Sequence, residues 1–137
     1  MISSPYDAQN AYRQVQTDTA SKEQSVVLLF EGAVRFLHQA RQAMQDKHYE
    51  EQSHHIGRVQ RILNELTCSL DPTHDEALTT SLRCCYTGMY NRLSEANIKD
   101  DVAALDEVTN LMSNFAQAWR QALESVAVGE EAAVAAG

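Results

Sequence analysis

The sequence predicts an all-α protein, an antiparallel up-down four-helix bundle. Apolar residues recur at intervals of three or four along most of the chain, which is the period of an amphipathic helix. No segment shows the period-two alternation of a strand, and the 137 residues include only five Gly and two Pro. The breaks between periodic segments are short, and short connections force neighbouring helices to run antiparallel. We expect a mobile N-terminal arm over residues 1–20, the four-helix bundle over 21–125 and a disordered tail over 126–137.

The first predicted helix begins at Ser21 and ends near Lys47. Ser21 and Gln24 have the spacing of a capping box, in which each side chain accepts a hydrogen bond from the other residue's backbone N–H. The second helix ends at Asp71-Pro72, and His54-His55 form a solvated turn near its start. The apolar stripes of the two helices are Val26, Leu29, Phe30, Ala33, Leu37, Ala40 and Met44, then Ile56, Val59, Leu63, Leu66 and Leu70.

The third predicted helix follows another possible capping box, Thr73 to Glu76, and is broken at Asn97-Ile98-Lys99-Asp100. Asp100 is the expected N-cap of the fourth helix. In that fourth helix, Trp119 is expected to anchor the core. The apolar stripes are Leu78, Leu82, Cys85, Met89, Leu93 and Ala96, then Leu105, Val108, Met112, Phe115, Trp119 and Ala122.

The charge balance excludes several classes of partner. Eleven Lys and Arg against nineteen Asp and Glu give a net charge of −8, which repels phosphate backbones and anionic lipid. We therefore expect no nucleic-acid binding and no membrane insertion. The longest strongly apolar run, Val26 to Phe30, is far too short to span a bilayer. Met1 to Asn10 lack the basic start and apolar stretch of a signal peptide, so we expect a cytoplasmic protein.

The residues that carry chemistry in other proteins do not form a recognisable site here. Glu51 and His54 form one Glu-x-x-His motif, but a di-iron bundle needs a second copy and two further inward glutamates. The three Cys residues form neither a disulfide framework nor a zinc pattern, and Cys85 is expected in the core beside its off-face neighbour Cys84. Neither a Gly-x-Ser-x-Gly motif nor a glycine-rich phosphate loop is present. We expect no catalytic residue, metal or cofactor.

Several apolar or amide side chains lie beside the narrow core stripes. They are Ile56 and Ile62 on the second helix, Tyr86, Tyr90 and Asn97 on the third, and Leu28, almost opposite the core stripe of the first. Two interpretations remain open. Neighbouring helices and the N-terminal arm cover these margins, or the margins form a groove for an external amphipathic segment.

Short sequence stretches along almost the whole chain point to a known family. They are Tyr12-Arg13-Gln14-Val15, Thr19-Ala20-Ser21, Leu28-Leu29-Phe30-Glu31-Gly32-Ala33, Ile62-Leu63-Asn64-Glu65-Leu66 with Leu70-Asp71, Tyr86 to Tyr90, Leu93-Ser94-Glu95-Ala96-Asn97, and Leu105-Asp106-Glu107-Val108 leading to Ala118-Trp119. In their order and spacing, over about Gln9 to Arg120, the chain resembles the flagellar secretion chaperones of bacteria, the FliS family. The departures are Lys22 for a proline, Phe30-Glu31-Gly32 for Tyr-Asp-Gly, and Cys85 for a leucine.

The resemblance implies an antiparallel helical bundle that binds the C-terminal segment of flagellin in the cytoplasm. Such a chaperone prevents premature filament assembly and helps deliver the subunit to the flagellar type III export gate. The resemblance also implies that Tyr12 contacts another export component. The alternative is a generic helical-bundle adaptor or regulatory protein that binds another amphipathic helix, and a homodimer is left open.

The expected partner-binding residues come from the arm and from the margins. They are Tyr12, Val15, Leu28, Ile56, Ile62, Tyr86, Tyr90 and Asn97. Tyr12 and Val15 lie in an arm that is too polar to fold alone, whereas Leu28 lies on an exposed surface. We therefore expect the arm to fold back over the bundle and to be displaced when the client binds. A disordered arm without contacts is the alternative.

Overall fold

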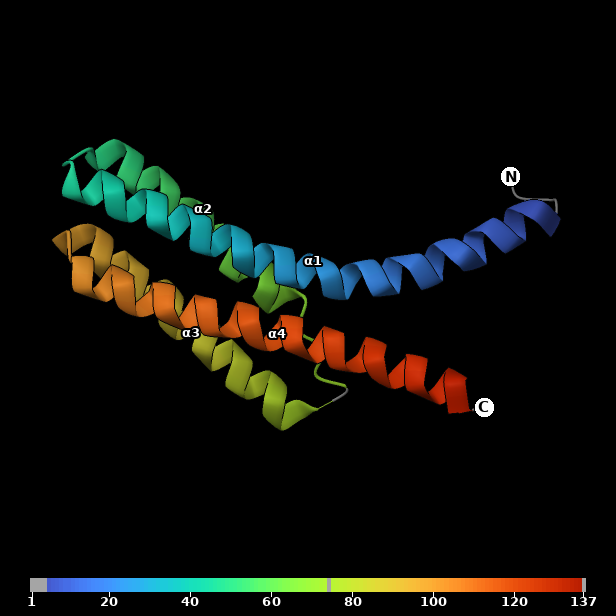
Figure 1. Ribbon diagram of the computed structural model, residues 1–137. Helices are drawn as coiled ribbons and strands as arrows, with labels where there is room; N and C mark the ends of the chain where they lie inside the picture. Colours follow the sequence, from blue (N-terminus) through green and yellow to red (C-terminus); the bar gives the residue numbers. More distant parts are fainter. Residues whose placement is uncertain (1–4, 74, 137) are drawn as a thin grey trace.

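The computed structural model describes residues 5–73 and 75–136, except for the side chains of residues 5–21 and of Glu130. Within these ranges the chain forms four helices and no strand: α1 (Pro5–Gln45), α2 (Tyr49–Cys68), α3 (Glu76–Lys99) and α4 (Val102–Ala136) (Figure 1). α1 packs against α2 and α4, and α3 packs against the same two helices. Successive helices run in opposite directions (Figure 1). The predicted all-α antiparallel bundle is confirmed.

The core lies where the four helices run together. Its largest fully buried side chains are Tyr86, Phe30, Leu37, Ile56, Leu63, Leu66, Leu93, Leu105 and Met112. Phe30 of α1 stacks on Phe115 of α4, with ring centroids 5.6 Å apart. Tyr86 of α3 packs at a tilt against Phe115, with centroids 6.1 Å apart. The aromatic rings therefore join three of the four helices at the centre of the bundle.

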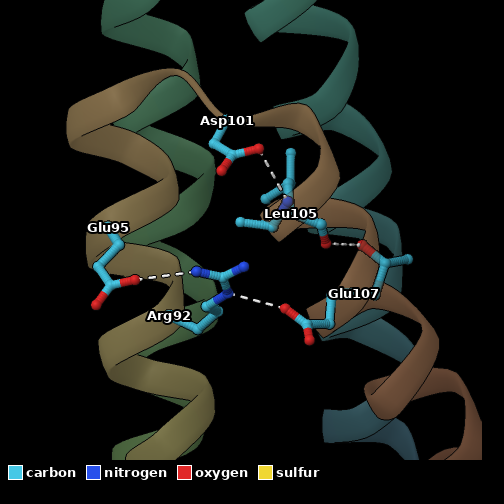
Figure 2. A network of polar contacts seen from close by, with 7 residues as sticks. Arg92, Glu95, Asp101, Leu105 and Glu107 are labelled. Carbon is cyan, nitrogen blue, oxygen red and sulfur yellow. Dashed lines mark hydrogen bonds and ion pairs between the residues drawn. The ribbon is translucent and has the colours of Figure 1, made fainter.

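A left-handed residue ends α3, and the residue after it caps α4. Asp100 has a φ of 51°, and its N–H donates to the carbonyl of Ala96. This conformation stops the helix, and Asp adopts it more readily than most residues do. The carboxylate of Asp101 then accepts a hydrogen bond of 3.2 Å from the N–H of Ala104 (Figure 2). The prediction that Asp100 caps the fourth helix is wrong, because that residue closes the preceding one.

α2 begins earlier than the sequence predicted. It starts at Tyr49, so His54 and His55 lie inside the helix and the predicted solvated turn at these residues is wrong. Glu50 and Glu51 occupy the first turn, where negative charge is stabilised by the helix dipole. These two acidic residues favour the earlier start.

The N-cap of α3 is Asp75 rather than Thr73. One carboxylate oxygen of Asp75 accepts a hydrogen bond of 3.0 Å from the N–H of Leu78. The hydroxyl of Thr73 donates to the carboxylate of Asp71 instead, at 2.6 Å. Asp75 supplies the stronger acceptor two residues closer to the first apolar turn, which explains the shift.

The N-terminal segment is helical, in contrast to the predicted arm. α1 begins at Pro5, and the backbone of residues 5–20 extends this helix beyond the bundle (Figure 1). Pro is favourable at the first position of a helix, and no further Gly or Pro occurs before Gly32. Ser21 therefore lies inside α1, and the prediction that the helix starts there is wrong.

A lid formed by folding the arm back is also absent from the described backbone. The helix continues in one direction from residue 5, so residues 5–20 extend α1 instead of folding back along it (Figure 1). The side chains of Tyr12 and Val15 lie outside the described part of the chain, and their predicted contacts are not among those described here.

The C-terminal segment extends α4 through Ala136, so the predicted disordered tail is helical over residues 126–136. Ala and Glu, strong helix formers, dominate this stretch. It runs past the ends of the shorter helices (Figure 1), and Val126 and Val134 are exposed there. Gly137 lies outside the described residues.

Candidate functional site

α3 turns a different face to the core from the one predicted. Met89 and Leu93 of the predicted stripe are buried, but Leu78 is 56% exposed and Cys85 is also exposed. Tyr86, predicted on the shoulder, is buried instead. The first half of α3 diverges from α4 (Figure 1), so the side of α3 that carries Leu78 and Cys85 is left open by the described helices.

The opening forms an apolar groove between α3 and α4, with a volume of about 350 Å³. The residues that line it are Cys85, Gly88, Met89, Arg92, Glu107, Val108, Leu111 and Phe115. Leu111 is 45% exposed on the α4 side. Apolar surface that gathers in a groove is typical of a binding site for another apolar segment.

Gly88 leaves open space on the α3 side of the groove. A Cβ atom built at this position would have no heavy atom within 4 Å. Gly inside a helix is less favourable than Ala by about 0.5–1 kcal/mol, so close packing in the free protein does not account for its presence. The missing side chain provides room for a group of a bound partner.

The exposed apolar strip continues from the groove toward the start of α3. Leu78 and Leu82 precede Cys85 along α3 at helical intervals, and Trp119 and Leu123 follow Phe115 along α4 in the same way. Leu78 is exposed, whereas Leu82, Trp119 and Leu123 are partly buried, with Leu82 and Trp119 also packed against the core. The rise of a helix makes the stretch from Leu78 to Arg92 about 21 Å long. Such a strip has the length of an amphipathic helix of about four turns.

An ion-pair network lies at the other end of the groove (Figure 2). The guanidinium of Arg92 on α3 donates to Glu107 on α4 at 2.8 Å and to Glu95, one turn further along α3, at 3.1 Å. These hydrogen bonds, first the one to Glu107 and then the one to Glu95, raise the pKa of Arg92. The charged network therefore ends the apolar strip and joins α3 to α4.

Two of the predicted partner-binding residues lie in the core. Ile56 is 1% exposed and Tyr86 is 2% exposed, so the prediction that they present a surface to a client is wrong for this structure. Burial raises the pKa of Tyr86 to about 12. Both residues are among the largest fully buried side chains, and their volume fills the closely packed centre of the bundle.

The other described candidates lie at the surface or partly below it, and they do not form one site. Leu28 is 64% exposed on α1, while Ile62, Tyr90 and Asn97 are partly buried. The side-chain oxygen of Asn97 accepts a hydrogen bond of 3.0 Å from buried Gln52. Asn97 is therefore already engaged inside the protein.

Tyr90 lies beside a second, smaller hollow between α2 and α3, of about 180 Å³. The residues that line it are Leu63, Asn64, Thr67, Tyr86, Thr87 and Tyr90. Ile62, the predicted neighbour of Tyr90 in a groove, does not line this hollow. The more apolar opening is the one on the other side of α3.

Sequence reasoning missed two residues of the α4 wall of the groove, Glu107 and Leu111. Leu111 precedes core residue Met112 and is not part of the predicted stripe, and Glu107 is not among the predicted site residues. Leu111 could have been found because it is a large apolar residue beside a core stripe that is already complete, which indicates apolar surface outside the core. Gly88 gave a weaker signal, as a glycine inside a helical pattern.

The described residues contain no group of three or more His, Cys, Asp or Glu side chains that could hold a metal ion. In the Glu-x-x-His motif, Glu51 lies 3.7 Å from the ring of His48, and the ring of His54 lies against that of His55. Within the described part of the chain, every helix is too short or too polar to cross a membrane.

Residues 5–126 match the family described as "Flagellar protein FliS". The chain is 33% identical to the flagellar secretion chaperone FliS of Bacillus subtilis (strain 168), over 90% of each chain. It is 36% identical to the FliS chaperone of Escherichia coli (strain K12), over 84% of this chain and 88% of that protein. A solved structure titled "Crystal structure of flagellar chaperone from bacteria" has the same fold, with a TM-score of 0.73 and 18% identity over 87% of this chain and 98% of the other.

Proposed function

Because this chain belongs to the FliS family of flagellar secretion chaperones, we propose that it binds the C-terminal segment of flagellin in the groove between α3 and α4. One observation carries the location: Leu78 and Cys85, which belong to the predicted core stripe of α3, are exposed. An amphipathic helix of the client supplies the apolar face that α4 does not supply there.

The apolar surface of the groove is large enough to support binding. Leu78 and Leu111 are each about half exposed, so covering each contributes about 1 kcal/mol. The aromatic and sulfur-containing side chains of Phe115, Met89 and Cys85 add to the contact. Ordering the client segment costs about 2–5 kcal/mol, so a stable complex must also cover apolar surface beyond Leu78 and Leu111. The result is a reversible complex, as a chaperone that later releases its client requires.

The same surface accounts for the chaperone's action. A client whose apolar stripe lies in the groove cannot pair with other flagellin subunits, so premature polymerisation is prevented. The net charge of −8 keeps the loaded complex in solution. The protein acts in the cytoplasm and brings the subunit to the export gate, where Tyr12 contacts an export component. It works as a binding protein, without catalysis.

Three other residues carry apolar surface outside the groove, namely Leu28 on α1, Ile62 on α2 and Tyr90 on α3. They are candidate contacts for parts of a long client that lie outside the groove. The hollow beside Tyr90 offers a second, weaker anchor. The α3–α4 groove remains the main site because its lining is the less polar of the two.

The proposal is tested by filling the groove. Calorimetric titration with a synthetic flagellin C-terminal segment from the same genome compares the unchanged protein with Gly88→Leu. Occupying the open space displaces one apolar side chain of the client, which corresponds to about 1.5 kcal/mol and about tenfold weaker binding. The matched control is Gly57→Leu on α2, because a Cβ there also has no atom within 4 Å and Gly57 does not line the groove.

Circular dichroism establishes that both variants are folded. Equal affinity of Gly88→Leu and Gly57→Leu would place the client elsewhere. If the flagellin segment does not bind, while an unrelated amphipathic helix binds and is weakened by Gly88→Leu, the chain is an adaptor for another partner. A segment with the same composition in scrambled order controls for non-specific apolar binding.

A further inference from the structure

We propose that Glu95 and Glu107 make the groove selective for a segment that carries a Lys or Arg at the end of its apolar stripe. This inference rests on the proposed function and specifies in addition that the client carries a positive charge at one position. Glu107 lines the groove, and Glu95 lies one turn beyond Arg92 on α3. A helix lying along the strip therefore reaches both carboxylates where its own apolar contacts end.

The network is arranged so that negative charge remains available. Arg92 contacts Oε2 of Glu95 and Oε2 of Glu107. The other oxygen of each carboxylate, Oε1, makes no hydrogen bond with the described residues. One guanidinium between two carboxylates leaves a net charge of −1, with both acidic side chains more than half exposed. A cationic group of the client completes the network.

The same geometry disfavours an acidic residue at that position. Arg92 is already held by two carboxylates, so a third would meet a site with net negative charge. A neutral client side chain would leave both free oxygens in water and gain nothing from them. The groove thus sets the register of the client by placing its basic residue at one end and its apolar residues along the rest.

The test measures the affinity of the same flagellin segment for Glu107→Gln and Glu95→Gln at low and high salt. Each variant binds about 1.5- to 5-fold more weakly at low salt, as expected for an exposed ion pair. The difference disappears near 1 M salt, where the screening length is about 3 Å. Glu50→Gln, which removes the same charge from the first turn of α2, leaves the affinity unchanged.

A double-mutant cycle identifies the client residue. Each Lys and Arg of the segment is replaced by Gln in turn, and one replacement weakens binding to the unchanged protein but not to Glu107→Gln. The absence of such a residue, or tighter binding by Glu107→Gln, overturns this inference alone if Gly88→Leu still blocks the groove. A segment that does not bind, or one that Gly88→Leu does not weaken, overturns the proposed site together with the inference.

Discussion

Replacing Gly88 by Ala should stabilise the free protein, although Gly88 lines the candidate site. The added Cβ would have no heavy atom within 4 Å, so neither a clash nor a new packing contact changes the stability. Only the helix preference remains, and it favours Ala over Gly by about 0.5–1 kcal/mol. For a protein of this size, the midpoint of thermal unfolding should rise by about 1–4 °C.

The measurement is thermal and urea unfolding followed by circular dichroism, for Gly88→Ala and for Gly57→Ala as the matched variant. Both should be stabilised by a similar amount, because both added Cβ atoms lie in open space within a helix. A Gly88→Ala protein that is less stable than the unchanged one, beside a stabilised Gly57→Ala, would show that α4 closes onto α3 in solution and that the groove is filled.

Two further predictions concern aromatic residues. Burial raises the folded-state pKa of Tyr86 to about 12, above the unfolded-state value of about 10. The free energy of unfolding should therefore not depend on Tyr86 below pH 10 and should fall by about 2–3 kcal/mol as the pH approaches 12. Urea unfolding of Tyr86→Phe at alkaline pH should lack this part of the loss, and a pH profile identical to that of the unchanged protein would contradict the burial of Tyr86. Trp119→Ala should cost about 2–3 kcal/mol in urea unfolding, less than the 3–5 kcal/mol of a fully buried Trp, because Trp119 is only partly buried. A larger loss would mean that Trp119 is a core anchor after all.

The number and order of the helices could be predicted because their apolar residues repeat with a clear period. The stripes of α1 and α2 were right almost to the residue: Phe30, Leu37, Val59 and Leu63 are all buried. Helix ends were harder to predict. Ser21 has the residue type of an N-cap, but an N-cap residue and the chain before it are not helical. Residues 6–20 contain no helix-breaking residue, so the helix continues through Ser21.

The site was harder to predict than the fold for a physical reason. Two adjacent faces of α3 are apolar, one with Cys85 and one with Tyr86, and a helical wheel does not show which of them the neighbouring helices cover. Tyr86 is buried because its ring fills the space beside Phe30 and Phe115. Once that larger side chain occupies the core, Leu78 and Cys85 are left outside. The apolar stripe that the sequence assigned to the core on α3 therefore marks, in its first half, the side of the groove.

The reactivity of a native thiol reports whether a client helix covers the α3–α4 groove. Cys85 lines the groove, whereas exposed Cys84 is its neighbour in sequence, about 100° around α3, and does not line it. Two single-cysteine proteins, each with the other two Cys residues replaced by Ser, are labelled with a small maleimide. At a client concentration of about ten times Kd, labelling of Cys85 should slow about tenfold, since only the unbound fraction reacts. Labelling of Cys84 should not change. An unchanged labelling rate at Cys85 with the flagellin segment bound would show that the client does not lie in the α3–α4 groove.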